Sequence, residues 1–251
     1  MTRLRLPIVG GFLAACAPAV MAGEQAHHWS YAGKEGPSHW AEIDAHNTAC
    51  AGKNQSPIAI RSSTVRTAAL PPLQFHYQAA PLRIVDNGHT IQVSYEPGSS
   101  LSVGGKRFEL IQFHFHRPSE EIIDGKRFAM VAHLVHRDVH GQLAVVAVPL
   151  SQARDNILIE TLWRNLPVEK EKEVSRPEIK INAAALLPAN LGYYSYTGSL
   201  TTPPCTEGVR WMVLKTPSAI STREVNVFAA RYPDDARPVQ PLNGREVMSS
   251  K

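Results

Sequence analysis

The chain has 251 residues, 43% of them apolar and only 19% charged, which is enough apolar material to bury a large core in one or two domains. A disordered or fibrous protein is therefore excluded. The formal net charge is +4 at pH 7, which gives no footprint for nucleic acid.

The first 22 residues predict a secretory signal peptide. Arg3 and Arg5 precede an apolar run of signal length, and Val20 and Ala22 suit a signal peptidase. Without this segment the chain has 24 basic and 22 acidic residues. The run is too short to span a bilayer, and no later stretch approaches the roughly 20 apolar residues of a membrane helix. The mature protein is therefore expected to be exported, soluble and periplasmic.

A second interpretation of the N-terminus is a lipoprotein. Residues 13–16 resemble the box in which a bacterial lipoprotein is acylated on cysteine, here Cys16, and the lipid would anchor the protein. We favour simple cleavage near Ala22, because almost no spacer separates Cys16 from the apparent start of the domain at His28 and Trp29.

Most apolar segments after the signal peptide alternate with a period of two, which predicts many half-buried strands separated by turns. The segments are residues 90–95, 108–116, 128–136, 143–150 and 209–215. No internal repeat, low-complexity tract or linker interrupts them. We therefore expect one mainly β domain over residues 23–251.

Helical signals are fewer. Asp155 is positioned to cap a short helix that has Leu158 and Leu162 on one side. Ser221 and Glu224 form a capping box ahead of a second amphipathic segment. Both helices are expected to be short and peripheral.

Two histidines share one face of the strand predicted over residues 108–116. Because side chains alternate along a strand, Gln112, His114 and His116 point to one side. The Cα atoms of the two histidines are then about 6.5 to 7 Å apart, a separation from which both imidazoles can bind one metal ion. Two ligands do not make a site, so a third is needed.

The segment 128–136 supplies two candidates for the third ligand. His133 shares a face with Val131 and Val135, whereas His136 lies on the opposite face. Alternation alone does not choose between the two histidines. We favour His133, because a catalytic zinc needs an apolar wall beside it and His136 runs directly into charged residues at a strand end.

Two cysteines, Cys50 and Cys205, remain after signal cleavage. In an oxidising periplasm a single pair predicts one disulfide, which would close a loop of more than 150 residues. The chain-entropy model values such a loop at roughly 5 kcal/mol. The alternative is two unlinked buried thiols.

From residue 28 to residue 245 the chain strongly resembles the α-carbonic anhydrases. Several distant blocks in the family's order are more specific than any single motif. The blocks are residues 28–40, 54–60 (NQSPIAI), 87–89 (NGH), 112–116 (QFHFH), 119–121 (SEE), 132–136 (AHLVH), 196–205 (YTGSLTTPPC), 209–215 (VRWMVLK) and 237–245 (RPVQPLNGR). The resemblance implies a mainly β fold, with a single domain around a large twisted, mostly antiparallel sheet and a few short peripheral helices.

The resemblance also implies a reaction, the reversible hydration of carbon dioxide to bicarbonate and a proton. Zn²⁺ would be held by His114, His116 and His133 at the bottom of a conical cavity, with water in the fourth position. In carbonic anhydrases the metal lowers the pKa of that water to about 7, a known property of the family, so that a zinc-bound hydroxide attacks carbon dioxide. Sulfonamides and anions are the expected inhibitors.

Other residues receive roles through the same resemblance. Thr201 would accept a hydrogen bond from the hydroxide and donate its own proton to Glu120, which would be a structural acceptor. Taken alone, Thr201 would be a turn threonine and Glu120 a surface acid. The substrate pocket would be formed by Val135, Val145, Leu200, Thr201, Thr202 and Trp211.

Regeneration of the hydroxide requires a proton to leave the site. His89 matches the family's proton shuttle, and imidazole titrates in the required range. His89 is also in phase with the apolar residues Ile91, Val93 and Tyr95, so a packed structural histidine is the alternative. Tyr31 and Gln92 would order the connecting waters, and Gln112 would support the first histidine.

Two positions depart from the family pattern. The family usually places a glutamate two residues before the third histidine, where it accepts that ligand's other N–H, and this chain has Val131. Losing such a partner typically costs 10- to 100-fold in metal affinity or activity. We therefore expect His133 to be poorly supported and zinc to leave faster than from Val131→Glu. Glu121 stands where a histidine commonly follows the conserved acid, so the network behind Glu120 must be arranged differently.

Two rival functions follow from the same residues. The spacing of His114, His116 and Glu120 fits part of a cupin motif for iron or manganese, but the flanking glycines and the second block of that family are missing. A non-catalytic zinc-binding module or periplasmic zinc store is the other rival, and retention of Thr201 and His89 argues against it. The sequence does not fix the oligomeric state, and a homodimer is compatible with it.

Overall fold

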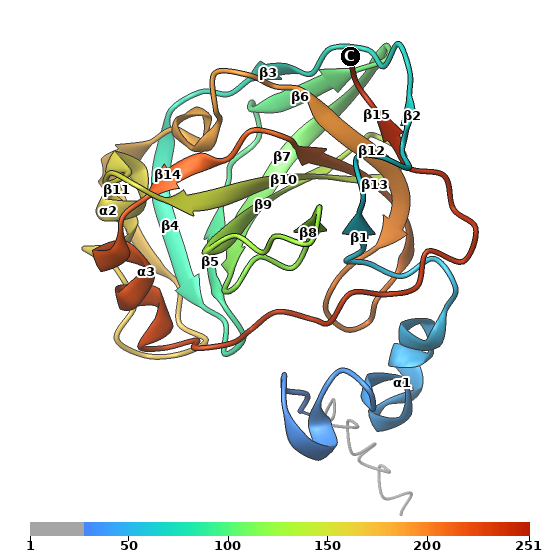
Figure 1. The fold of residues 1–251 in the computed structure, drawn as a ribbon. Helices are drawn as coiled ribbons and strands as arrows, with labels where there is room; N and C mark the ends of the chain where they lie inside the picture. Colours follow the sequence, from blue (N-terminus) through green and yellow to red (C-terminus); the bar gives the residue numbers. More distant parts are fainter. Residues whose placement is uncertain (1–27) are drawn as a thin grey trace, which may run out of the picture.

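A computed structural model of the chain describes residues 28–251, so the predicted signal peptide and Cys16 lie outside the described residues. Strands dominate this part of the chain (Figure 1). The strands are β1 Ala59–Ile60, β2 Arg66–Thr67, β3 Gln74–His76, β4 Ala80–Asp86, β5 Ile91–Ser94, β6 Ser100–Val103, β7 Lys106–His116, β8 Ile122–Ile123, β9 Met130–Arg137, β10 Leu143–Gln152, β11 Val174–Ile181, β12 Tyr193–Ser199, β13 Glu207–Leu214, β14 Ser218–Ile220 and β15 Met248–Ser249. The helices are α1 Trp40–Ile43, α2 Ile157–Trp163 and α3 Thr222–Ala229, with 3-10 helices η1 Gly33–Glu35, η2 Ala45–Ala51 and η3 Ala183–Leu186. Among the described residues, no helix is both long enough and apolar enough to cross a membrane.

One twisted sheet of thirteen strands forms the body of the molecule (Figure 1). Its strand order is β11-β4-β5-β7-β9-β10-β13-β12-β15-β2, with β3, β6 and β14 attached beside this path. Most neighbours are antiparallel, which confirms the predicted fold class. However, β10 runs parallel to β13 and to β14, and β15 runs parallel to β2. Alternation within a strand says nothing about the direction of its neighbour, so these parallel pairs were not predicted.

The five segments predicted as strands lie together at the centre of this sheet. They correspond to β5, β7, β9, β10 and β13, which are consecutive in the strand order. Central strands pack apolar side chains on at least one face, so their alternation is the clearest in the sequence.

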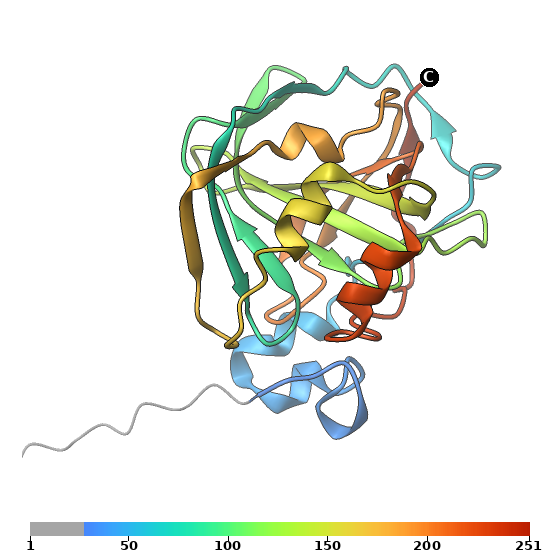
Figure 2. The same cartoon turned by 90° about the vertical axis from the view of Figure 1, so that its left-hand side faces the viewer.

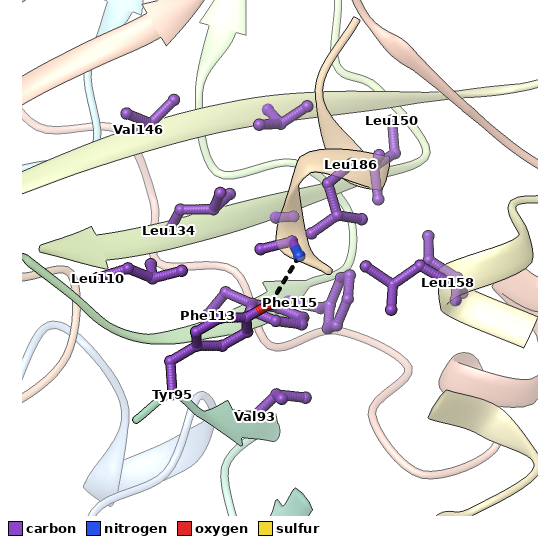
Figure 3. Close-up of a cluster of buried hydrophobic side chains, with 14 of the residues drawn as sticks. Val93, Tyr95, Leu110, Phe113, Phe115, Leu134, Val146, Leu150, Leu158 and Leu186 are labelled. Atoms are coloured by element: carbon purple, nitrogen blue, oxygen red, sulfur yellow. Dashed lines mark hydrogen bonds between the residues drawn. The ribbon is translucent and has the colours of Figure 1, made fainter. Parts of the chain in front are cut away.

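The central strands are covered on both faces, and the two faces differ. On the core face, Phe113, Leu134 and Val146 belong to the larger apolar cluster (Figure 3), which also contains side chains of α2 and α3. Both helices lie against this side of the sheet (Figure 2). On the opposite face, here called the site face, a smaller cluster contains Val135 and Trp211.

The two predicted helices are present, with one correction. At α3 the capping box of Ser221 and Glu224 is formed as predicted. At α2 the cap is Asn156, not Asp155, because the Asn156 side chain accepts hydrogen bonds from the backbone N–H groups of Leu158 and Ile159. Asn156 follows Asp155 in the chain, and its side-chain oxygen accepts hydrogen bonds from the free N–H groups of the first turn. Asp155 therefore lies outside the helix.

Candidate metal centre

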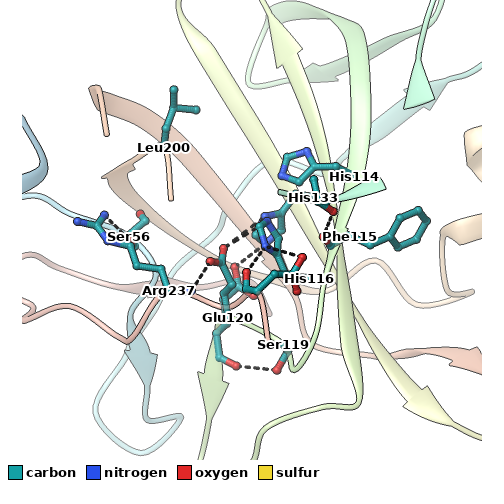
Figure 4. A network of polar contacts seen from close by, with 12 residues as sticks. Ser56, His114, Phe115, His116, Ser119, Glu120, His133, Leu200 and Arg237 are labelled. Carbon is teal, nitrogen blue, oxygen red and sulfur yellow. Dashed lines mark hydrogen bonds and ion pairs between the residues drawn. The ribbon is translucent and has the colours of Figure 1, made fainter. Parts of the chain in front are cut away.

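The register of the sheet places the predicted ligands side by side on the site face. His114 on β7 pairs directly with His133 on β9, and Gln92 on β5 pairs with His114 from the other side. His116 follows two residues further along β7 and pairs with Val131. Because side chains alternate, three imidazoles meet over one patch of the sheet (Figure 4).

The three imidazoles converge on one point. One nitrogen from each ring lies within 4.8 Å of the corresponding nitrogen of the other two. The ring centroids are 5.0 Å apart for His114 and His116, 5.5 Å for His114 and His133, and 4.9 Å for His116 and His133. His116 and His133 are buried, whereas His114 is partly exposed.

The second nitrogen of each ring lies beside an oxygen acceptor. The distances are 2.8 Å from His114 Nδ1 to Gln112 Oε1, 2.8 Å from His116 Nδ1 to the Asp235 carbonyl oxygen, and 3.0 Å from His133 Nε2 to Glu121 Oε1. Each ring can therefore donate outward and turn its other nitrogen inward. Outer partners of this kind fix the tautomer and the orientation of metal-binding histidines.

The chemistry of the inward-facing group fits a zinc ion. Nε2 of His116 is buried and makes no hydrogen bond within residues 28–251, so a metal ion would provide its missing partner. Burial lowers the pKa of His114 to about 3 and the pKa of His116 well below its ordinary value. Both rings are then neutral, the form in which imidazole binds metals. Three neutral nitrogen ligands are a donor set of catalytic zinc sites with an open fourth position.

Glu121 overturns the expectation drawn from Val131. The third histidine does have a carboxylate partner, but the partner comes from the loop before β8 and not from β9 itself. For His133, burial lowers the pKa, but the carboxylates of Glu121 and Glu120 outweigh that effect and raise it. The prediction that His133 is poorly supported is therefore wrong.

His136, the other candidate for the third ligand, points to the core face. Its Nε2 lies 2.7 Å from the hydroxyl of Tyr77, and its Nδ1 lies 3.3 Å from the carbonyl oxygen of Ala144. Burial lowers the pKa of His136 to about 4. The ring is thus a neutral, hydrogen-bonded part of the core, and the structure brings His133 to the site instead.

Glu120 is fully buried beside the three rings (Figure 4). Its Oε1 accepts a hydrogen bond of 2.8 Å from the backbone N–H of Arg237, and its Oε2 lies 3.7 Å from His116 Nε2 and from His133 Nδ1. Burial raises the pKa of Glu120 to about 7, although the nearby hydroxyl of Thr201 lowers it. The structure therefore brings the predicted pair of Glu120 and Thr201 together.

The loop that carries Thr201 is tied to distant parts of the chain. Within the loop, the backbone N–H of Cys205 donates a hydrogen bond to the backbone carbonyl of Thr202. The residue Thr202 is partly exposed. The predicted disulfide between Cys50 and Cys205 is present, with 4.9 Å between the Cα atoms. This covalent link fastens the loop to the N-terminal segment at η2.

An apolar wall stands next to the three histidines. Val135, Val145 and Trp211 occupy directly paired positions on β9, β10 and β13, so their side chains lie in one row on the site face. Leu200 packs against the same cluster. The Trp211 ring lies 5.0 Å from the ring of His133, edge to face. These four predicted pocket residues therefore pack in one apolar cluster beside the site.

His89 lies in the turn before β5. Its backbone N–H donates to Asn87 Oδ1, and its ring stacks on Trp29 with centroids 3.6 Å apart and planes 7° apart. The side chain is half-buried. Burial, together with nearby His28 and Lys170, lowers its pKa to about 4. His89 is thus packed against an aromatic ring while still in contact with solvent.

Tyr31 also lies close to the site. Its hydroxyl is buried and makes no hydrogen bond to the part of the chain that the structure describes. Burial raises the pKa of Tyr31 well above its ordinary value, and the carboxylates of Glu120 and Asp235 add to the effect. A buried hydroxyl without a protein partner is suited to bind an ordered water.

Two further buried residues of the site were not predicted. Asp235 offers its backbone carbonyl to His116. The guanidinium of Arg237 donates to the backbone carbonyls of Ser56 and Cys50 and so links the loop under Glu120 to the N-terminal segment. A backbone carbonyl leaves no sequence signal. Arg237, by contrast, opens one of the resembling blocks and could have been found.

The fold and this site define a class: a β-sheet protein with three histidines that can hold one metal ion, a buried acid near a threonine, and an apolar wall. The family model for eukaryotic-type carbonic anhydrase matches residues 35–251. A carbonic anhydrase of Pectobacterium carotovorum is 41% identical over 225 residues, which cover 88% of this chain and 90% of that protein. The chain therefore belongs to the family of eukaryotic-type, or α-class, carbonic anhydrases, and it is an enzyme of that type.

Solved structures agree with this assignment. The α-carbonic anhydrase of Thermovibrio ammonificans, solved with the inhibitor sulfanilamide, is 42% identical, with a TM-score of 0.86 and coverage of 89% of this chain and all of that one. A hyperthermostable carbonic anhydrase from an active hydrothermal vent chimney is 47% identical, with a TM-score of 0.85 and the same coverage. The rival assignment to the cupins is thereby excluded.

Proposed function

We propose that the chain catalyses the reversible hydration of carbon dioxide to bicarbonate and a proton at a Zn²⁺ ion held by His114, His116 and His133. The observation that carries the proposal is the convergence of three ring nitrogens within 4.8 Å, while the second nitrogen of every ring lies beside an acceptor. When bound, the ion would supply a water acidified to hydroxide near neutral pH.

Thr201 and Glu120 orient the attacking oxygen. When Glu120 is ionised it can only accept hydrogen bonds, so the hydroxyl of Thr201 would then donate to it. Thr201 Oγ1 is then available only as an acceptor toward the reacting group. With this order of donors and acceptors, Thr201 would accept the proton of a hydroxide supplied by the bound ion and so would leave an oxygen lone pair for the substrate.

The apolar wall suits carbon dioxide. The molecule has no net dipole and accepts hydrogen bonds weakly, so a surface of Val135, Val145, Leu200 and Trp211 can hold it beside the attacking oxygen without competing polar groups. Thr202 is partly exposed, and we assign it to the edge of this pocket from the family resemblance. Bicarbonate carries a charge that such a wall does not compensate, which favours its release.

A proton must leave after each turnover. If the water supplied by the bound ion has a pKa near 7, direct release of its proton to bulk water would be limited to roughly 10³ to 10⁴ per second. The limit arises because the proton is recaptured at the diffusion-controlled rate. We assign faster proton transfer to His89, across waters ordered by Tyr31 and Gln92. Gln112 has a separate role, which is to hold the first ligand, His114. While the His89 ring is stacked on Trp29, its pKa is about 4. The ring therefore accepts a proton well only when it turns toward water, where imidazole titrates near pH 6.5.

Export to the periplasm after cleavage near residue 22 completes the proposal. The disulfide between Cys50 and Cys205 supports it, because such bonds persist in oxidising compartments. The relative solved with sulfanilamide supports inhibition by aromatic sulfonamides.

Stopped-flow measurement of carbon dioxide hydration tests the proposal. Zinc-loaded protein should accelerate the reaction, and removal of zinc with a chelator or addition of an aromatic sulfonamide should abolish the acceleration. Zinc-loaded, folded protein that hydrates carbon dioxide no faster than buffer would instead identify a non-catalytic zinc-binding module.

A further inference from the structure

Glu121 holds the third histidine from a position where the family pattern commonly has a histidine. We propose that Glu121 is the positioning residue of His133, and that Glu121 with Val131 replaces the glutamate the family usually carries two residues before this ligand. This inference rests on the proposed zinc site, but it concerns how tightly and in which orientation the third ligand is held.

The contact between the two side chains defines the donor. Glu121 Oε1 lies 3.0 Å from His133 Nε2, and each residue is only 1% exposed. A carboxylate accepts, so the ring carries its proton on Nε2. Nδ1 then keeps its lone pair and faces His114 and His116. The carboxylate therefore fixes the tautomer that a metal ion requires.

The backbone delivers Glu121 to this place through two anchors. On one side, Ser119 Oγ donates to the carbonyl of Glu121 at 3.0 Å and accepts from the N–H of Phe128 at 2.9 Å. On the other side, β8 follows immediately and pairs in parallel with β1. The carboxylate is thus held by a short segment fixed at both ends.

Val131 is the second half of the exchange. It is fully buried on the same face as His133 and packs in one cluster with Ile58 and Ile60. His133 has one outward N–H, which satisfies one carboxylate. A second buried carboxylate at position 131 would find no donor there, and burying an unpaired charge is costly. An apolar residue at position 131 is therefore what the presence of Glu121 requires.

The surroundings of Glu121 differ from those of a buried carboxylate with a structural role. Glu224 is also 1% exposed, and its two oxygens accept from the backbone N–H groups of Asn156 and Ser221, which ties α3 to the start of α2. Glu121 Oε2 is buried and makes no hydrogen bond within the described residues. The other oxygen of Glu121, Oε1, is hydrogen-bonded to His133.

Zinc release tests the inference directly. Zinc-loaded wild type, Glu121→Gln and the matched control Glu224→Gln are mixed with excess 4-(2-pyridylazo)resorcinol, and formation of the zinc–dye complex is timed. Glu121→Gln should release zinc about 10- to 100-fold faster. Glu224→Gln loses a buried carboxylate away from the site and should release zinc at the wild-type rate. Equal rates for Glu121→Gln and wild type would overturn the inference.

A rescue experiment separates positioning from general damage. Val131→Glu alone should not slow zinc release, because the His133 N–H is already occupied. The double variant Glu121→Gln with Val131→Glu should return to the wild-type rate within about threefold. If Glu121→Gln does not fold, the double variant decides alone: near-wild-type release supports the inference, and release tenfold faster contradicts it.

A proton NMR signal gives a readout that structural damage would not mimic. The hydrogen-bonded Nε2 proton of His133 should shift or broaden in Glu121→Gln and stay unchanged in Glu224→Gln. An unshifted signal in Glu121→Gln would contradict the inference. Absence of carbon dioxide hydration by the wild type would overturn the proposed function and leave these zinc and NMR results valid.

Discussion

His133 and His136 stand three residues apart on β9, both buried, and they face opposite environments. On the site face, His133 has a carboxylate at 3.0 Å and two other imidazoles around it. On the core face, His136 has a tyrosine hydroxyl at 2.7 Å and a backbone carbonyl at 3.3 Å. The carboxylates raise the pKa of His133 in spite of its burial, whereas burial lowers that of His136 to about 4.

The comparison shows that burial does not define the role of a histidine. Both rings are removed from water, so both would be neutral if burial acted alone. What separates them is the partner: a charged acceptor with two neighbouring rings prepares one for a metal, and neutral partners make the other a hydrogen-bonded core residue. Four predictions test this difference between the two faces of β9.

The largest effect is expected from removal of His133. His133→Ala should lose its zinc on dialysis and hydrate carbon dioxide at the buffer rate, because two histidines do not complete the site. His136→Ala, the matched change on the other face, should keep one zinc per folded chain. Zinc content by atomic emission and folding by circular dichroism check both, and retention of a full zinc by His133→Ala would contradict the assignment of the ligand.

Leu134→Ala lies between the two histidines and should damage the core without touching the metal. Leu134 is fully buried on the core face, paired with Phe113 on β7 and Val146 on β10. Truncation should lower the free energy of unfolding by about 2 to 5 kcal/mol, the usual cost of such a cavity. Urea unfolding measures the loss, with Leu134→Ile as the control of similar volume. A folded variant that binds zinc less tightly would show that the faces are coupled.

His136 should make the protein sensitive to acid. The ring takes up a proton near pH 6.5 in the unfolded chain but only near pH 4 in the folded one. Between these values the unfolded state binds more protons, so stability falls as the pH drops from about 6.5 to 4, by at most roughly 3 kcal/mol. His136→Gln should show a shallower fall in urea unfolding across this range. Identical pH slopes for zinc-loaded wild type and variant would exclude this role.

Much of the difference between the two faces could be predicted from the sequence. Alternation along residues 128–136 places His133 and His136 on opposite faces, and the apolar neighbours of His133 favour it as the ligand. The same alternation identified β5, β7, β9, β10 and β13, because these strands lie at the centre of the sheet. Local pattern suffices where a side chain's role depends on its own strand.

The partners of the histidines could not be predicted in the same way. The carbonyl of Asp235 is 119 residues from His116, and every residue has such a carbonyl, so no sequence signal marks it. Glu121 reaches His133 from a short segment that is held by Ser119 on one side and by the pairing of β8 with β1 on the other. The sequence shows that position 131 carries no carboxylate to accept the N–H of His133. Only the fold shows that Glu121 supplies this carboxylate.

The smallest effect is expected from Tyr77→Phe, which removes a single hydroxyl from the core side of β9. Tyr77 Oη lies 2.7 Å from His136 Nε2, and the variant keeps the ring but leaves that nitrogen without this partner. An unsatisfied buried group costs about 1 to 3 kcal/mol, and we expect the lower end because His136 Nδ1 keeps the Ala144 carbonyl.

A double-mutant cycle isolates this hydrogen bond. Urea unfolding of Tyr77→Phe, His136→Gln and the double variant gives the coupling energy between the two side chains, which should be about 1 kcal/mol. The zinc release rate should be the same in wild type and Tyr77→Phe, because the hydroxyl lies on the face opposite the metal centre. A changed release rate with zero coupling to His136 would mean that Tyr77 acts on the site through the sheet and not through this histidine.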